Sequence, residues 1–250
     1  MRIISRLDIK NEFLIKGLSL EGLRKLGNPN DFAEKYYKQG ADELLYIDSV
    51  ASLYSRDAIF ELLKLATKNI FIPLTVGGGI NSVEMANEYF SSGADKIFVN
   101  TGAVNNPSLI NILVDRFGSA NICVSIEAKR IDDNNWNVFT SSGRDNSNIN
   151  VLDWVKESTE RGVGEILITS VDNDGFENGF DYDLIDNVLD VTHIPIIASG
   201  GFGRLEHLEK LNNSLSGIAI ASALHYGKIN IEDIKKHLSK LGIETRWKVM

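Results

Sequence analysis

The sequence predicts an α/β fold in which eight parallel strands close into one barrel. Three observations favour it. Eight short apolar runs alternate along the chain with amphipathic segments, and motifs of the first half recur in the second half. The length of 250 residues is also about what a single closed barrel of this kind needs. We therefore expect one domain over residues 1–250, a (βα)8 TIM barrel built from two repeated half-barrels.

The apolar runs are short and rich in Ile, Val and Leu, which is typical of strands buried on both faces of a parallel sheet. They span Ile3–Leu7, Leu44–Ile47, Ile70–Val76, Ile97–Val99, Ile122–Ile126, Ile166–Ile168, Ile194–Ala198 and Ile218–Ala221.

The segments between the runs carry apolar residues at helical spacing and polar residues on the other face, so they predict helices. They span Phe32–Lys38, Ala58–Thr67, Ser82–Ser91, Ser108–Phe117, Leu152–Arg161, Asp183–Asp190, Leu205–Asn212 and Ile231–Lys240. Strand and helix alternate throughout, and closure into a barrel is the most economical arrangement for eight such units.

The two halves repeat each other at matched positions. Gly78–Gly79 follow the third run and Gly200–Gly201 follow the seventh. Asn100 follows the fourth run and Ser222 the eighth, at the same separation along the chain. Self-similarity at a fixed spacing is the signature of a duplicated structural unit.

Composition excludes several classes of protein. A net charge of −8 argues against nucleic acid as a partner, and no apolar run approaches the roughly 18 residues of a membrane span. The single Cys123 cannot form an internal disulfide, and the four His lack the spacing of a metal site. We expect a cytoplasmic protein with no cofactor and no metal.

Two carboxylates fall where a parallel barrel places its active site, at the carboxyl ends of the strands. Asp8 follows the first run and Glu127 follows the fifth, so the two would face each other across the mouth. Such a pair suits general acid and base work on two faces of a substrate. The alternative is that either residue is a rim residue in a salt bridge.

The glycine-rich turns at matched positions predict two phosphate sites, because small residues and helix N-termini let backbone N–H groups approach an anion. The alternative is that these glycines serve only tight turns. After the sixth run, Asp174 is either a third catalytic carboxylate or a helix cap; spacing does not distinguish these. The long connections 10–30 and 129–150 at the same rim are either lids over the substrate or mobile insertions. We expect the second to contain a hairpin that turns at Asp133–Asn134.

The opposite end of the barrel carries a second cluster of charges, each immediately before an apolar run: Arg2, Glu43, Lys96 and Glu165. Alternation along the strands points these side chains toward the axis. They would form a closed ring of ion pairs, which either plugs the barrel or gates a small polar molecule.

The chain resembles one family along nearly its whole length, the HisF cyclase subunit of imidazole glycerol phosphate synthase. The shared strings are Leu7-Asp8-Ile9-Lys10, Lys16-Gly17, Leu23–Pro29, Asp42-Glu43-Leu44, Leu74–Ile80, Glu127-Ala128-Lys129-Arg130, Thr169–Gly175 and Pro195–Gly201. The related isomerase HisA shares the half-barrel repeat and the opposed carboxylates but lacks the Lys-Gly and Gly-Asn-Pro pattern of the first loop.

The resemblance implies a substrate with two phosphates, the ribulosyl formimino-aminoimidazole-carboxamide ribonucleotide PRFAR. Ammonia from a HisH-like glutaminase subunit would enter through the ring of charges and cross the barrel. Asp8 would be the general acid and Glu127 the base. The implied substrate contacts are Lys16, Ser142, Thr169 and Asp174; one phosphate would lie on Gly79, Asn100 and Thr101, and the other on Gly175, Gly201, Ala221 and Ser222.

One departure keeps a second function open. The family has Asp where this chain has Glu127, and one extra methylene places the carboxylate about 1.5 Å further out, where roughly 1 Å of misplacement can cost on the order of 10²-fold in rate. The alternative is a HisF-like paralogue that works with a HisH-like glutaminase and supplies ammonia to a sugar-modifying amidotransferase of surface-polysaccharide synthesis.

Overall fold

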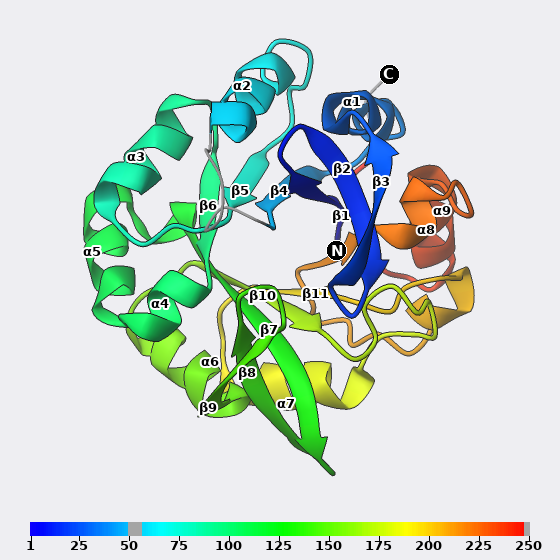
Figure 1. Cartoon of the computed structure of the whole chain (residues 1–250). Helices are drawn as coiled ribbons and strands as arrows, with labels where there is room; N and C mark the ends of the chain where they lie inside the picture. Colours follow the sequence, from blue (N-terminus) through cyan, green and yellow to red (C-terminus); the bar gives the residue numbers. More distant parts are fainter. Residues whose placement is uncertain (50–56, 248–250) are drawn as a thin grey trace.

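Eight parallel strands form a closed barrel in the computed structural model, which describes residues 1–49 and 57–247 (Figure 1). In order around the barrel they are β1 (Arg2–Lys10), β4 (Glu43–Asp48), β5 (Leu74–Gly77), β6 (Lys96–Val99), β7 (Ile122–Asp132), β10 (Glu165–Ser170), β11 (Ile196–Ser199) and β12 (Gly217–Ile220). The barrel closes where β12 pairs with β1, Ile3 opposite Ile218. The predicted fold class is confirmed.

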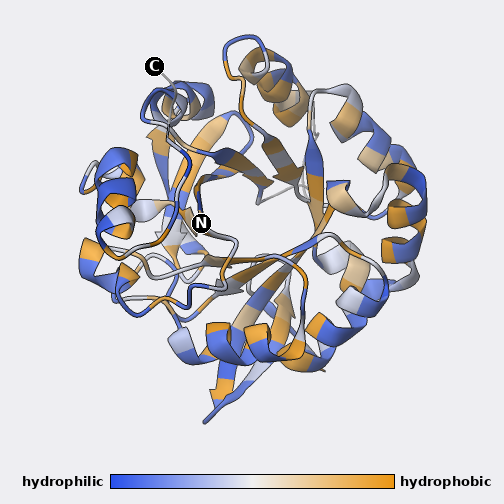
Figure 2. Cartoon of the chain, turned by 180° about the vertical axis from the view of Figure 1, so that it is seen from behind, coloured by the Kyte–Doolittle hydropathy of each residue, from blue (hydrophilic) through white to orange (hydrophobic). Residues whose placement is uncertain are grey.

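Helices surround the barrel (Figure 1). They are α1 (Pro29–Lys38), α2 (Asp57–Ala66), α3 (Val83–Ser91), α4 (Thr101–Asn105), α5 (Ser108–Phe117), α6 (Val151–Glu160), α7 (Tyr182–Val191), α8 (Ser222–His225) and α9 (Ile231–Lys240). Apolar and hydrophilic residues alternate along them, as Figure 2 shows from behind. This is the pattern of helices that bury one face against a sheet.

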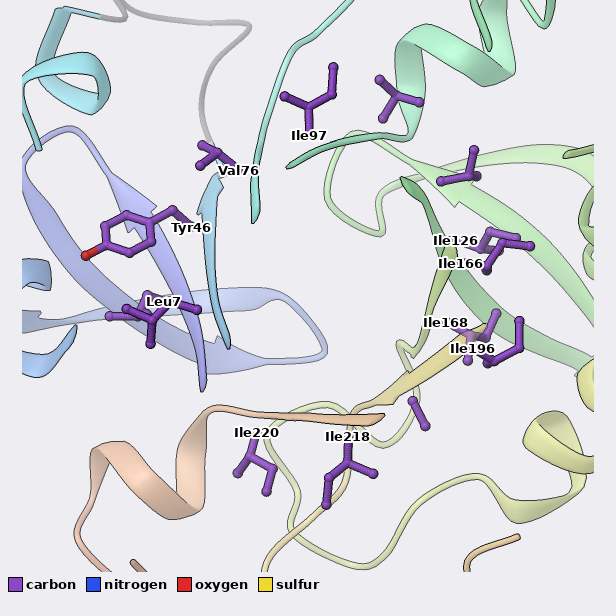
Figure 3. Close-up of a cluster of buried hydrophobic side chains, with 14 of the residues drawn as sticks. Leu7, Tyr46, Val76, Ile97, Ile126, Ile166, Ile168, Ile196, Ile218 and Ile220 are labelled. Carbon is purple, nitrogen blue, oxygen red and sulfur yellow. The ribbon is translucent and has the colours of Figure 1, made fainter. Parts of the chain in front are cut away.

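The main hydrophobic core lies between the strands and the helices. Side chains such as Leu7, Val76, Ile126 and Ile218 are at most 1% exposed, and they point outward from the strands toward the helices (Figure 3). Because successive strand residues point to opposite faces, the alternate residues face the barrel axis. Asp8 and Glu127 belong to this inward set.

The barrel interior holds three kinds of side chain along its axis. Charged residues lie at the amino ends of the strands, and polar and charged residues lie at the carboxyl ends. Between them is a separate apolar cluster of Ile4, Leu45, Phe98, Cys123, Leu167, Ile197 and Ala219. This cluster keeps the two charged ends apart.

Three predicted elements are shorter than the sequence patterns indicate. The strands predicted from Ile70 and from Ile194 begin only after Pro73 and Pro195, because proline has no N–H to donate to a ladder. The helix predicted over Leu205–Asn212 is a single 3-10 turn, Leu205–Leu208. Asn212 and Asn213 follow it, and asparagine favours turns over helix.

Both long connections at the mouth are extensions of the sheet. The first, predicted as a long loop, is a hairpin that turns at Ser19–Leu20, both with positive φ. The second turns at Asp133–Asn134 as predicted and adds a third strand. The strands are β2 (Phe13–Leu18) and β3 (Glu21–Gly27) in the first, and β8 (Asn135–Thr140) and β9 (Asp145–Asn150) in the second.

Candidate active site

Asp8 and Glu127 lie at the mouth of the barrel, as predicted. β1 and β7 carry them on the inward face, and both residues line the same cavity of about 20 Å³. Lys16 and Ser142, from the two rim hairpins, line it as well. The hairpin β2–β3 therefore covers the small cavity at the two carboxylates, while Glu127 also lines a larger pocket.

Arg6 lies one inward position below Asp8 on β1, and its side chain is almost completely buried. Its Nε donates to Asp8 Oδ1 at 2.9 Å. Its Nη1 donates to Thr169 Oγ1 at 3.1 Å and to Ser199 Oγ at 3.2 Å. The guanidinium thus spans the barrel from β1 to β10 and β11 directly beneath the mouth.

Lys16 reaches the same carboxylate from above. Its Nζ lies 3.7 Å from Asp8 Oδ2 and 2.6 Å from Asp174 Oδ2. Lys16, Asp8 and Asp174 are each at most 5% exposed. Burial alone would raise the pKa of Asp8, but Arg6 and then Lys16 outweigh burial and hold that pKa below its ordinary value. Asp8 is therefore ionised.

Glu127 has a different environment. Its Oε2 accepts a hydrogen bond from the Gly143 N–H at 2.8 Å, and it forms no ion pair with any described residue. Burial raises the pKa of Glu127 to about 7; the Gly143 N–H and Arg6 oppose this increase. Two facing carboxyls with separated pKa values are the arrangement that acid and base catalysis requires.

The first predicted phosphate site lies in a pocket of about 360 Å³ beside Glu127. Gly79, Asn100 and Thr101 line it, as predicted, and so does Arg144. Gly79 has a φ of +63°, which glycine adopts without strain. Thr101 begins α4, so the N-terminal end of this helix lies at the pocket.

The second predicted phosphate site is partly assembled. A pocket of about 640 Å³ beneath the hairpin β2–β3 is lined by Gly175, Ser222 and Lys16, together with the cations Arg24 and Lys228. Gly201 and Ala221 lie on the neighbouring turns but do not line this pocket. A Cβ on Gly201 would lie 1.9 Å from the carbonyl oxygen of Gly179, so the close approach of two backbones requires that glycine.

The small cavity joins the two pockets. It shares Glu127 and Ser142 with the first pocket and Lys16 and Gly17 with the second. The three cavities therefore lie next to one another along the mouth, and the two carboxylates line the middle one.

Comparison with known proteins decides the family. The family model described as "Histidine biosynthesis protein" matches residues 2–230. The chain is 51% identical over 206 residues to the imidazole glycerol phosphate synthase subunit HisF of Legionella pneumophila, covering 82% of this chain and 97% of that protein. HisF of Streptococcus mutans is 41% identical, and HisF of Pyrococcus furiosus 42% identical, each across 98% of both chains.

The chain belongs to the HisF family. HisF proteins are subunits of imidazole glycerol phosphate synthase, an enzyme of histidine biosynthesis, and the resemblance inferred from the sequence is confirmed.

The four charges at the other end of this HisF barrel form the predicted ring. Arg2 Nη1 lies 2.7 Å from Glu43 Oε2, and its other nitrogen pairs with Glu165. Lys96 Nζ lies 3.1 Å from Glu165 Oε2 and 3.5 Å from Glu43 Oε2. Each carboxylate therefore contacts both cations. Thr75 Oγ1 also donates to Glu43 Oε1, at 2.5 Å.

Two other predicted residues lie beside the site with internal partners. Thr169 accepts from Arg6, and the Ser142 hydroxyl donates to the backbone oxygen of Ser49 at 3.3 Å. Asp174 pairs with Lys16 on the rim hairpin rather than capping a helix.

Sequence reasoning did not assign a role to Arg6, Ser199 or the Gly143 N–H. Alternation along β1 places Arg6 on the inward face with Asp8, and this signal was sufficient to find it. Gly143 was not predictable, because its N–H reaches Glu127 from a turn beyond β8.

Two other kinds of site are absent from the described part of the chain. Over residues 1–49 and 57–247, no cluster of three or more His, Cys, Asp or Glu is arranged to hold a metal ion. None of the helices described has the length and apolar character of a membrane span.

Proposed function

We propose that this HisF chain is the cyclase subunit that converts PRFAR and ammonia into imidazole glycerol phosphate and aminoimidazole carboxamide ribonucleotide. The observation that carries the proposal is the row of neighbouring cavities at the mouth: two opposed carboxyls between two pockets at related positions of the half-barrels. A substrate with a phosphate at each end fits this arrangement.

The roles of the site residues follow from where they lie. Asp8 and Glu127 divide the acid and base work at the centre. Gly79, Asn100 and Thr101 hold one phosphate, with Arg144 adding positive charge. Gly175 and Ser222 hold the other phosphate in the second pocket, with Arg24 and Lys228 in support. Gly201 and Ala221 contribute from the neighbouring turns.

Lys16 acts on the substrate through the rim hairpin. Its ammonium is buried between Asp8 and Asp174 while the hairpin is closed. Movement of the hairpin carries Lys16 away from both carboxylates and admits the substrate, and reclosure excludes water from the reaction. Ser142 and Thr169 contribute hydroxyls at the same level of the barrel.

As a subunit, HisF works within a complex, and we infer a HisH-like glutaminase as its partner. The ring formed by Arg2, Glu43, Lys96 and Glu165 is the entry for ammonia in this proposal. Its four ion pairs close the barrel at rest, so a partner must displace at least one charged side chain for ammonia to pass. A cytoplasmic location for the complex stays a prediction.

The first experiment measures turnover of PRFAR by the isolated chain with a high concentration of ammonium salt at alkaline pH, so that no glutaminase is needed. Asp8→Asn is the control. We expect turnover by the parent chain that is lost in the control.

No turnover by a well-folded parent chain would contradict the cyclase proposal. The chain would then be tested as the ammonia-supplying paralogue, for which the comparisons offer no support. The readout would be glutamine-dependent amidation of a sugar substrate in the presence of a HisH-like subunit.

A further inference from the structure

The two carboxyls at the mouth face very unequal numbers of cations. Each carboxylate oxygen of Asp8 has a cation beside it: Arg6 Nε lies 2.9 Å from Oδ1, and Lys16 Nζ lies 3.7 Å from Oδ2. Glu127 accepts hydrogen bonds from two neutral donors, the Gly143 N–H at 2.8 Å and the Asn100 side chain, and it is in no ion pair with a described residue. An ion pair favours the charged form of a carboxyl, whereas burial without one favours the neutral form.

We propose that Arg6 is a positioning residue that fixes Asp8 as the carboxylate base of the pair and leaves Glu127 as its carboxylic acid. This is the reverse of the assignment that family resemblance implies. The inference deepens the proposed cyclase function and rests on it for its catalytic consequence. The distribution of protons in the resting protein does not depend on that function.

The geometry around Arg6 makes its effect on Asp8 permanent. Thr169 and Ser199 hold Nη1 from the far side of the barrel, so the guanidinium cannot turn away when the hairpin opens. Lys16 is different, because it leaves with the hairpin β2–β3. When the substrate enters, Arg6 alone keeps Asp8 ionised.

Other charged groups around the pair come from several elements. From the loop after β10, Asp174 faces Arg6 and Lys16; from α8, His225 faces Asp8. Burial lowers the pKa of His225 to about 4, although Asp8 opposes this, so His225 is neutral near pH 7. Arg144 and Asp48 line the pocket beside Glu127 with opposite charges.

With these roles, the protons balance over the first two steps of the reaction on a ribulosyl ketone. Ammonia forms a bond to the carbonyl carbon, the carbonyl oxygen takes the proton of Glu127, and the nitrogen gives one proton to Asp8. The product is a carbinolamine, with Glu127 ionised and Asp8 protonated. Loss of water then takes the proton from Asp8 and returns one from nitrogen to Glu127. The carbinolamine becomes an imine, and the pair is reset.

Carboxyl titration by NMR tests the resting state without any substrate. The chain would be labelled with ¹³C at the side-chain carboxyls of Asp and Glu and followed from pH 3 to pH 9. Glu127→Gln and Asp8→Asn assign the two signals by their loss. We expect one carboxyl to titrate near pH 7 and to vanish in Glu127→Gln, while the signal lost in Asp8→Asn stays ionised to below pH 4. The reverse assignment would overturn the proposal.

Variants of Arg6 test the cause. In Arg6→Met, which keeps the length of the side chain without its charge, we expect Asp8 to titrate more than one pH unit higher. Arg6→Lys keeps the charge and should restore most of the native titration. An Asp8 titration that is unchanged in Arg6→Met would show that Arg6 has no such role. If Arg6→Met does not fold, the two assignment variants still decide which carboxyl holds the proton.

The pH dependence of turnover tests the catalytic consequence. With the rate expressed per free ammonia, kcat/KM for PRFAR should fall above about pH 7, as Glu127 loses its proton. Glu127→Asp should shift this alkaline limb, and Arg6→Met should raise the acidic limb by more than one pH unit. If neither limb of the pH profile moves in these variants, the assignment of Asp8 as base and Glu127 as acid is overturned. Absence of turnover in the parent chain would instead contradict the proposed function, and the NMR titration would still decide the inference.

Discussion

The two ends of the barrel interior use similar side chains in opposite ways. At the amino end, Glu43 and Glu165 share Arg2 and Lys96, so each carboxylate contacts both cations. At the carboxyl end, Asp8 has two cations and Glu127 is in no ion pair with any residue the structure describes.

This difference separates a structural closure from a reactive centre. In the balanced ring every charge is compensated, and removing one carboxylate leaves Arg2 and Lys96 to share the other. In the unbalanced pair, Asp8 is ionised and the pKa of Glu127 lies near 7. A group whose pKa is close to the working pH exchanges protons most effectively. The apolar layer around Ile4 and Leu167 keeps the two sets of charges from compensating each other.

The largest expected effect comes from Glu127→Gln at the mouth. The amide keeps the shape of the side chain but cannot donate a carboxyl proton, so we expect ammonium-dependent turnover of PRFAR to fall by about 10³-fold. At pH 5, where the Glu127 carboxyl is protonated in the folded protein, the free energy of unfolding should change little, because the carboxyl that is lost is neutral and in no ion pair. Steady-state rates and urea unfolding measure the two effects. A large loss of stability with normal turnover would show that Glu127 has a structural role and not a catalytic one.

The same substitution in the ring should act on stability. Glu43 is 1% exposed and contacts Arg2, Lys96 and Thr75. Glu43→Gln leaves two cations with one carboxylate, and we expect a loss of about 3 kcal/mol in the free energy of unfolding. Glu61→Gln is the matched control, because Glu61 pairs with Lys64 on the exposed face of α2 and surface pairs contribute little. Equal losses in the two variants would argue that the ring does not depend on compensated charge.

Much of the fold was predictable because strand and helix patterns repeat eight times. The misjudged elements each have a local cause. Pro73 and Pro195 shorten two strands from within an apolar run, and proline's missing N–H outweighs hydrophobicity there. The hairpin β2–β3 was hidden because its turn uses Ser19 and Leu20, two residues that rarely adopt positive φ.

The site was predictable in its composition and not in its charge balance. Position after a strand identified Asp8 and Glu127, and strand alternation identified the ring. The bond from Arg6 to Asp8 joins residues two apart on one strand, but Thr169 and Ser199 fix the guanidinium from other strands. Such long-range contacts leave no periodic pattern in the sequence.

The pH dependence of stability should report the proton on Glu127. Its pKa rises from 4.5 to about 7 on folding, chiefly through burial, so the native state binds a proton that the unfolded chain releases. Stability is therefore unaffected below about pH 4.5 and declines as the pH rises to about 7, by about 3 kcal/mol. Urea unfolding at pH 5 and pH 8 should show this decline in the parent chain and not in Glu127→Gln. An equal decline in both proteins would place the proton on another group.

The smallest expected effects come from the neutral hydroxyls at each end. Thr75→Val removes the hydrogen bond to Glu43, and Ser199→Ala removes the one from Arg6. Each should cost about 1 kcal/mol in the free energy of unfolding, because each leaves a buried charge with one fewer partner. Only Ser199→Ala should also change the pH profile of turnover, since it loosens the guanidinium that holds Asp8 ionised. A shifted profile in Thr75→Val would mean that the apolar layer does not isolate the two ends.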